Sequence, residues 1–481
     1  MAGSTPDPAS VRRLPRSIGA AGVVGLTLSA LSPAASVYVT GSAILRLAGT
    51  GAVPAVIAGG VVILLASLLY AEVGAAFPHA GGIYPGIGAI LGPSAARVAI
   101  VLGLVSSPAL LAFVSLGLAD YVQLYAPAWP KTIIVPTLIA AACGIAALNI
   151  QISVRITMLL LIVELVALAI LVAIGVAHPA RSVAQVMLRP VAVGGTGGLV
   201  AVPMATMFVA TVSGAFACAG SGLALYFADD LTGRPQRIGW LVVIVGIVTV
   251  VLVASPLLAI CIAMRDPVAT LRSTAPIATF ISDRAGAGVA AGTVAAVVLA
   301  IFNNLVASTI AFGRFLYATG MDGTWTRAVD RRLTTLHPRY GSPVFAIVLL
   351  GVAALVACLI GQRALLALLS AEVFTALLVV IAVVVGRRRR LTGIGTFRSP
   401  LFPLAPVLGL AVIAAFVMVD WTGPGDNRIA VCALAATASL TFLVSRWASG
   451  RAAGGRAASG PAAGEPSSRN RLREVSSQPR S

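Results

Sequence analysis

The chain has 481 residues, of which 59% are hydrophobic and only 10% are charged. A soluble protein carries about 25% charged residues, so this chain lacks the polar surface that a water-soluble globule needs. Its mean hydropathy of +1.01 indicates a polytopic membrane protein. The formal net charge of +18 does not indicate nucleic-acid binding, because the basic residues are scattered over short loops beside the apolar segments.

Twelve apolar segments approach or exceed the roughly 20 residues that a helix needs to cross the hydrocarbon core of a bilayer. Strands of a membrane barrel alternate over about 10 residues, whereas these runs are continuous and longer, so the expected fold class is all-α. The predicted spans are residues 18–45, 52–76, 98–124, 132–149, 156–177, 203–228, 239–264, 287–319, 343–361, 364–386, 401–419 and 428–446.

The charges outside these spans predict the orientation. Residues 1–17 contain three Arg and no apolar run, and we expect a cytoplasmic tail. The first span is too long for the core of a cleaved signal. With the N-terminus inside, most of the 33 Lys and Arg residues fall on inner segments, as the positive-inside rule requires, and both termini are cytoplasmic. Residues 18–446 are the expected membrane domain.

Residues 447–481 are rich in Gly, Ala, Ser, Pro and Arg, a composition that predicts a disordered cytoplasmic tail. The basic run 387–390 at the inner end of span ten is expected to act as a stop-transfer anchor; contact with anionic lipid head groups is the alternative. The Arg-rich, nearly Lys-free composition is typical of a high-GC bacterial genome and therefore predicts a bacterial inner membrane.

The sequence contains no pattern of residues that predicts catalysis. All five Cys residues fall within predicted spans, so no disulfide is expected. No Cys and His spacing resembles a metal site, and no Walker motif or nucleophile triad is present. The chain is therefore not expected to be an enzyme or to bind a cofactor or metal.

The first and the sixth predicted spans are interrupted. Residues 31–36 (Leu-Ser-Pro-Ala-Ala-Ser) break the first span, and residues 217–222 (Ala-Cys-Ala-Gly-Ser-Gly) break the sixth. Lipid cannot satisfy a free backbone N–H or C=O, so unwound backbone is tolerated only where protein, water or a ligand meets it. Paired broken helices at matching places in two halves indicate the substrate site of a transporter. A Pro or Gly kink with packing alone is the alternative.

A broken helix suits an amino acid, because its half-helix N-terminus attracts a carboxylate and its C-terminus attracts an ammonium. The N–H groups of Ala34, Ala35 and Ser36 are expected to bind the carboxylate. Carbonyl groups near Leu31 and Ser32 and at residues 216–219 are expected to bind the ammonium. The predicted substrate-binding residues on the second break are Phe216, Cys218, Ala219, Gly220, Ser221 and Gly222.

Three segments in order resemble the amino acid–polyamine–organocation (APC) superfamily, in its bacterial amino acid permease type. Residues 70–84 resemble its second-span signature, with Ala-Glu-Val, then Phe-Pro and Gly-Gly-Ile-Tyr. Residues 216–235 resemble its sixth-span pattern of a Gly break followed by an acidic pair and Pro. Residues 314–323, with 337–339 and 342–343, resemble the end of its eighth span and the following loop. The resemblance covers roughly residues 18–446.

This resemblance implies a LeuT-like core of two inverted repeats, spans one to five and six to ten, with spans eleven and twelve added. It also implies amino acid transport by alternating access, an aromatic gate at Phe216 and a site residue at Ser308. The chain departs from the family where Ser-Pro-Ala-Ala-Ser replaces the common Gly-Ser-Gly of the first break, and where Gly222 replaces a frequent acidic residue. These departures leave the expected fold unchanged and bear on which substrate the protein carries.

Ionisable residues inside spans are functional candidates. Glu164 lies in the middle of span five, where apolar surroundings favour the neutral carboxyl group, so it is expected to couple a proton to the substrate; a structural, hydrogen-bonded Glu is the alternative. Asp120 and Glu372 are expected to attract cations or to belong to an outer gate; a merely interfacial position is the alternative for Asp120. Asn304 and Ser308 share one face of span eight and are expected to line the site or to join helices.

Three more carboxylates lie at inner span ends close to Arg residues. Glu72, Asp229 and Asp230 are expected to form ion pairs of an inner gate or of a loop rather than to touch the substrate.

Together these patterns predict a secondary active permease that carries an amino acid, with proton symport. A polyamine or cationic amino acid carrier is the first alternative, because Asp120, Glu164 and Glu372 have no Lys or Arg partner in their own spans. An exporter of a small organic compound and a non-transporting membrane sensor are the others.

Overall fold

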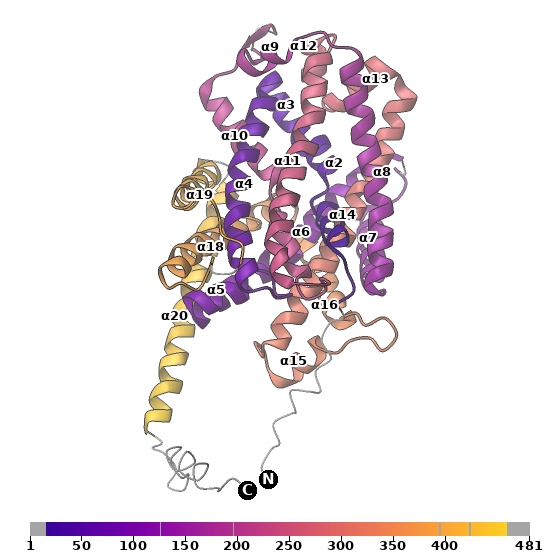
Figure 1. Cartoon of the computed structure of the whole chain (residues 1–481). Helices are drawn as coiled ribbons and strands as arrows, with labels where there is room; N and C mark the ends of the chain where they lie inside the picture. Colours follow the sequence, from indigo (N-terminus) through magenta and orange to yellow (C-terminus); the bar gives the residue numbers. More distant parts are fainter. Residues whose placement is uncertain (1–15, 126, 196, 394–395, 423–424, 459–481) are drawn as a thin grey trace, which may run out of the picture.

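The computed structural model describes residues 16–458, except 126, 196, 394–395 and 423–424. Nearly all of this part of the chain is helical, and its long helices run side by side in one bundle (Figure 1). The short helix α15 (Arg327–Leu333) lies at one end of the bundle, and the short helices α9 (Val183–Leu188), α12 (Pro267–Arg272) and α13 (Pro276–Ala285) lie at the other.

The first half of the chain contains both broken helices. Its elements are α1 (Ala20–Leu31), α2 (Pro33–Ala35), the π-helix η2 (Ser36–Gly41), α3 (Ser42–Ala48), the 3-10 turn η3 (Gly49–Gly51), α4 (Ala52–Ala76), α5 (Tyr84–Leu91), α6 (Pro93–Tyr125), α7 (Lys131–Ala146), α8 (Ile150–Ala177), the strands β1 (Val191–Val193) and β2 (Leu199–Ala201), α10 (Met204–Cys218) and the 3-10 helix η4 (Ser221–Phe227).

In the second half, all regular elements of the described residues are helices. Its remaining elements are the 3-10 turn η5 (Pro235–Arg237), α11 (Ile238–Ala263), α14 (Ala287–Met321), α16 (Val344–Ala357), the 3-10 turn η6 (Cys358–Ile360), α17 (Gln362–Leu368), α18 (Ala371–Arg388), α19 (Leu404–Thr422) and α20 (Gly425–Ala458).

Nine helical segments of the described chain are long and apolar enough to cross a membrane. The first of them, Ala20–Ala76, includes both the first and the second predicted span, because the helical path continues through the turn Gly49–Gly51. The predicted spans four and nine correspond to the shorter apolar helices Lys131–Ala146 and Val344–Ile360. A polytopic, nearly all-α fold therefore agrees with the sequence, while the number of twelve spans and the inverted repeat stay predictions.

Two local features differ from the sequence expectation. The strands β1 and β2 pair antiparallel in the connection between α9 and α10, where no strand was predicted, and the N–H of Val191 donates to Thr50 Oγ1 at 2.8 Å. In addition, α20 continues to Ala458, past residue 447, at which the tail was predicted to begin. Residues 451–458 include Ala, the residue with the highest helix propensity. The remainder of that tail, and residues 1–15 of the predicted N-terminal tail, lie outside the described residues.

Small residues allow α4 to approach the second broken helix closely. A Cβ atom on Gly59 of α4 would lie 2.3 Å from the backbone nitrogen of Ala215, and one on Gly214 of α10 would lie 2.8 Å from Cα of Val56. Close backbone contact of this kind is the usual way in which helices associate in membranes, where lipid is as apolar as the side chains. The second broken helix is thus packed firmly against α4.

A buried ion pair joins α4 to α18 near the loop that precedes α19. Arg387 Nε donates to Glu72 Oε1 at 2.7 Å, and the Glu72 side chain is fully buried. The same carboxylate accepts from Thr392 Oγ1 at 3.0 Å and from the N–H of Ser399 at 2.9 Å. The ion-pair prediction is confirmed for Glu72. It is also confirmed for Asp230, which pairs with Arg314. Asp229 instead accepts from the N–H of Ala80 at 3.1 Å and forms no ion pair among the described residues.

Replacing Arg387 by Met is expected to destabilise the protein by about 3–5 kcal/mol, because it leaves the buried carboxylate of Glu72 without its cation. The matched control is Lys131→Met. Lys131 and its partner Asp120 are both 46% exposed, and an exposed pair of this kind contributes about 0–1 kcal/mol. Thermal unfolding of the two purified variants in one detergent would compare them. Equal losses in the two variants would contradict the structural importance of the buried pair.

Candidate functional site

The first helix is interrupted at a single residue. Helix α1 ends at Leu31, and Ser32 adopts the left-handed conformation with φ 46° and ψ 81°. Pro33 explains the position of this interruption, because proline has no N–H to continue the helix and disfavours the α conformation in the residue before it. Winding resumes at once in α2, followed by the π-helix η2. The interruption is therefore present as predicted, but it is shorter than residues 31–36.

The carboxyl group of Glu164 lies at this interruption. Glu164 projects from α8 and is fully buried. Its Oε1 accepts from the N–H of Ala34 at 2.8 Å and from the hydroxyl of Ser32 at 3.0 Å. The N–H groups at the start of a helix attract negative charge, and the new helical start after Ser32 binds one oxygen of the Glu164 carboxyl group in this way. The other oxygen, Oε2, is buried and has no hydrogen-bond partner among the described residues.

The other backbone donors of this interruption are also engaged. The N–H of Ala35 donates to Ser32 Oγ at 3.4 Å, and the N–H of Ser36 donates to the carbonyl of Ser32 at 3.0 Å. These are the groups to which the sequence analysis assigned the carboxylate of a substrate. In the structure each of the three N–H groups already has an acceptor, and the strongest of these contacts is the one between Ala34 and Glu164.

Helix α14 borders the first interruption along one of its faces. Asn304 Nδ2 donates to the carbonyl of Ala30 at 2.7 Å, and Ser32 Oγ lies 3.4 Å from the carbonyl of Ala300. Ser308 lies one turn further and is fully buried, with no partner for its hydroxyl within the part of the chain that the structure describes. The structure thus brings Asn304 to the first broken helix but shows no bond from Ser308 to it.

The sequence analysis missed Asn303. This residue is fully buried, and neither atom of its amide has a hydrogen-bond partner in the described ranges. A buried amide without partners is costly. The signal that could have indicated it is the Asn-Asn pair itself, since two adjacent amides in an apolar span are expensive unless they have partners.

The second interruption lies directly against the first. Helix α10 ends at Cys218, Ala219 is extended, and Gly220 has φ 116°. A Cβ atom on Gly220 would lie 2.3 Å from Cδ2 of Leu31, so the absence of a side chain there lets Leu31 of the first broken helix fit. Both predicted breaks are therefore present, and Leu31 and Gly220 touch.

Other residues of the second break contact α4 rather than the first break. The hydroxyls of Ser221 and Ser67 of α4 lie 2.7 Å apart, and a Cβ atom on Gly222 would lie 2.9 Å from the ring of Tyr70. Cys218 is fully buried. Ser221 and Gly222 therefore serve the contact with α4.

A comparison with known protein families identifies the family of this chain. The family model described as amino acid permease matches residues 19–442, which include both broken helices, α8 and α14. This chain belongs to the amino acid permease family of the APC superfamily. A search of curated proteins finds no match. Permeases of this kind are membrane proteins that transport small molecules, and the apolar helices of the chain agree with that function.

The three predicted gate residues of the permease differ in their surroundings. Phe216 is 44% exposed. Asp120 forms an ion pair with Lys131 and accepts from Gln362 Nε2 at 3.4 Å, so it joins α6 to α7 and α17. Glu372 accepts from the hydroxyl of Ser106 at 2.7 Å and joins α18 to α6. Each of these two carboxylates thus connects helices, and their gate role stays a prediction.

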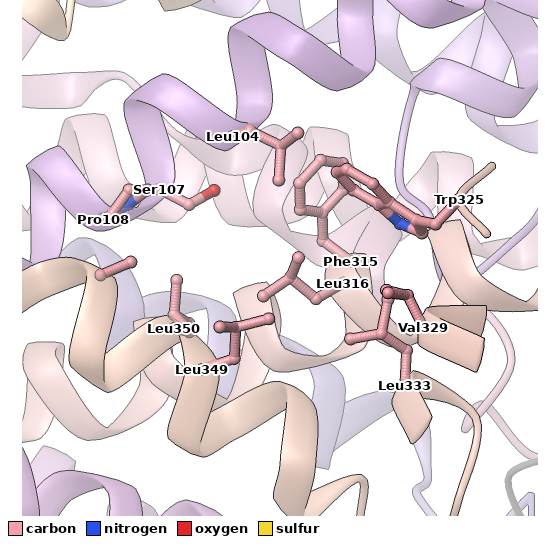
Figure 2. Close-up of a pocket in the computed structure, with 11 residues that line it drawn as sticks. Leu104, Ser107, Pro108, Phe315, Leu316, Trp325, Val329, Leu333, Leu349 and Leu350 are labelled. Atoms are coloured by element: carbon pink, nitrogen blue, oxygen red, sulfur yellow. The ribbon is translucent and has the colours of Figure 1, made fainter. Parts of the chain in front are cut away.

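A separate apolar pocket of about 150 Å³ lies between α6, α14, α15 and α16. Figure 2 shows Phe315 and Leu316 of α14 facing Trp325, Val329 and Leu333, with Leu104 and Ser107 of α6 on the opposite side. None of the residues that line this pocket belongs to either break.

In the part of the chain that the structure covers, no group of three or more His, Cys, Asp or Glu side chains is arranged to hold a metal ion.

Proposed function

We propose that this permease is a secondary active transporter that moves an amino acid across the cytoplasmic membrane together with a proton, by alternating access. Residues 18–446 form its transport domain, with spans one to five and six to ten as inverted repeats, spans eleven and twelve added, and both termini in the cytoplasm. The substrate binds between the two breaks, and Glu164 carries the coupling proton. One observation carries this proposal: the Glu164 carboxyl group is bonded directly to the first break.

Proton coupling requires a group that can be charged in one state and neutral in another, placed where the substrate binds. Glu164 is fully buried, and among the described residues the donors to its carboxyl group are the N–H of Ala34 and the hydroxyl of Ser32. A buried charge is costly unless such donors are present. Any event that takes these donors away therefore favours the neutral, protonated carboxyl group. In this arrangement, movement of the first broken helix and protonation of Glu164 are linked.

Alternating access also requires a closure that can open, and the contacts near α15 supply one. The N–H groups of Ser17 and Ile18, just before α1, both donate to the carbonyl of Asp230 at 3.0 Å, and the N–H of Thr232 donates to the carbonyl of Ile18 at 2.9 Å. The Asp230 carboxylate pairs with Arg314 of α14. These contacts hold the two broken helices and α14 together at one end, which we assign to the cytoplasmic side.

Uptake into proteoliposomes tests the proposal. Radiolabelled neutral amino acids should accumulate when the lumen is alkaline, and the accumulation should disappear when the gradient is collapsed. Competition with lysine and putrescine addresses the second candidate, a cationic amino acid or polyamine carrier, which the unpartnered Oε2 of Glu164 favours as an acceptor for an ammonium group. Absence of uptake or exchange for every amino acid and amine would refute the transporter proposal.

A further inference from the structure

The first break of this permease already holds a carboxylate, and that carboxylate belongs to the protein. The Ala34 N–H and the Ser32 hydroxyl would suit the carboxylate of an amino acid, yet Glu164 Oε1 accepts from both, at 2.8 and 3.0 Å. Two carboxylates cannot share these donors at once, because like charges a few ångströms apart repel strongly in a medium of low dielectric constant.

We propose that Glu164 occupies the carboxylate position of the empty site and that the carboxylate of the arriving amino acid displaces it. This inference rests on the proposed function. The displaced Glu164 loses the donors that compensate its charge and takes one proton from water. The loaded site then contains the substrate carboxylate on Ala34 and Ser32 and a neutral Glu164 carboxyl group. When the substrate leaves, Glu164 releases the proton and returns to the break.

Among the described helices that pack most extensively against α8, no charged group is free to keep Glu164 ionised after displacement. Helix α8 packs against α1, α2, α7, α11, α13 and α14. Helices α1, α2 and α11 contain no charged residue. The charged residues on the other packed helices and on α8 itself either bond elsewhere or are exposed: Arg314 with Asp230, Lys131 with Asp120, Arg284 with the carbonyl of Ala263, and Asp283 and Arg155, both exposed.

Displacement makes the proposed coupling obligatory. A substrate with a carboxylate can bind only if Glu164 no longer accepts from the Ala34 N–H and the Ser32 hydroxyl. Glu164 can lose these two hydrogen bonds at low energetic cost only if it takes up a proton. An amine without a carboxylate has no reason to displace Glu164, so it should bind without proton uptake. The carboxylate of the substrate is thus the specificity determinant that separates coupled from uncoupled binding.

Isothermal titration calorimetry tests this on the full-length protein in detergent, in two buffers of different ionisation enthalpy. The probes are three amino acids and the amines that correspond to them without the carboxyl group: L-alanine with ethylamine, L-serine with ethanolamine, and L-leucine with 3-methylbutylamine. Each amino acid that binds should take up about one proton per molecule, and its affinity should rise about tenfold per unit decrease in pH while Glu164 is ionised in the empty site. An amine that binds should take up none.

Two variants make the assignment specific. Glu164→Gln has nearly the same shape, and its amide oxygen can still accept from Ala34, so it should bind the amino acid with no proton uptake and no dependence on pH. Asp283→Asn removes an exposed carboxylate from α13, which also packs against α8, and it should behave as the wild type. In infrared difference spectra, binding should produce the C=O band of a protonated carboxyl group in the wild type and in Asp283→Asn, but not in Glu164→Gln.

The wild-type titrations decide the question even if Glu164→Gln fails to fold. Amino acid binding without proton uptake, or equal proton uptake by amino acids and amines, would overturn the displacement while leaving transport itself intact. Proton uptake by Glu164→Gln equal to that of the wild type would overturn it as well. If none of the six compounds binds and proteoliposomes take up no amino acid or amine, the proposed function fails, and the displacement that rests on it fails too.

Discussion

Replacing Glu164 by Gln is expected to abolish the accumulation of substrate that a pH gradient drives. One proton carried with each amino acid allows a gradient of one pH unit to support about a tenfold concentration ratio. A Gln side chain cannot take up or release that proton, so the variant should reach no accumulation above equilibrium. Exchange of labelled for unlabelled substrate should persist, because the neutral amide resembles the protonated carboxyl group of the loaded site.

The measurement is uptake into proteoliposomes with an alkaline lumen, normalised to the amount of reconstituted protein, beside a counterflow assay without a gradient. Asp283→Asn serves as the control for loss of a carboxylate that is exposed and lies away from the break. Gradient-driven accumulation by Glu164→Gln at the wild-type level would refute the coupling role, whereas loss of both accumulation and counterflow would indicate that Glu164 is needed for the structure of the site.

Replacing Gly220 by Ala is expected to reduce transport at least tenfold. Gly220 has φ 116°, where a residue with a side chain is strained by about 1–3 kcal/mol. The added Cβ atom would lie 2.3 Å from Cδ2 of Leu31, so Leu31 would have to move from its place between the two breaks. Because each 1.36 kcal/mol corresponds to a factor of ten in rate, strain of this size at the substrate site is enough for the expected loss.

Gly292→Ala is the matched control. Gly292 lies in α14, and a Cβ atom there meets nothing within 4 Å, so an Ala at this helical position should fold and transport normally. Initial uptake rates of the two variants, with the fraction of monodisperse protein from size-exclusion chromatography, would separate a local effect on the site from a failure to fold. Normal uptake by Gly220→Ala would show that the contact between Leu31 and Gly220 does not matter for transport.

Much of the architecture follows from local chemistry in the sequence. Continuous apolar runs predict helices, since lipid leaves the backbone no other way to satisfy its hydrogen bonds within one segment. Pro33 marks the end of α1 to within two residues, and Gly220 marks the second break, because proline restricts the backbone and glycine relaxes it wherever they occur. The lengths of the helices were predicted less accurately than the positions of the breaks. The helices Lys131–Ala146 and Val344–Ile360 are shorter than the spans predicted there.

The hydrogen-bond partners within the site could not be predicted from local sequence patterns. The sequence placed Glu164 in the middle of a span, but the N–H that it accepts from is 130 residues earlier in the chain. Which donor meets which acceptor depends on the rotation of α8 about its axis and on its distance from the first break, and no local pattern encodes these. For the same reason the Ala34 N–H was predicted to bind the carboxylate of a substrate, whereas in the structure it donates to Glu164.

The sequence by itself thus determined that this protein is a helical membrane permease with two broken helices, because hydropathy and the conformational limits of Pro and Gly act within a few residues. Only the tertiary structure decided that a buried carboxyl group from α8 lies on the first break and that the two breaks touch at Leu31 and Gly220. Contacts between distant segments arise from the packing of whole helices, which is a property of the assembled bundle.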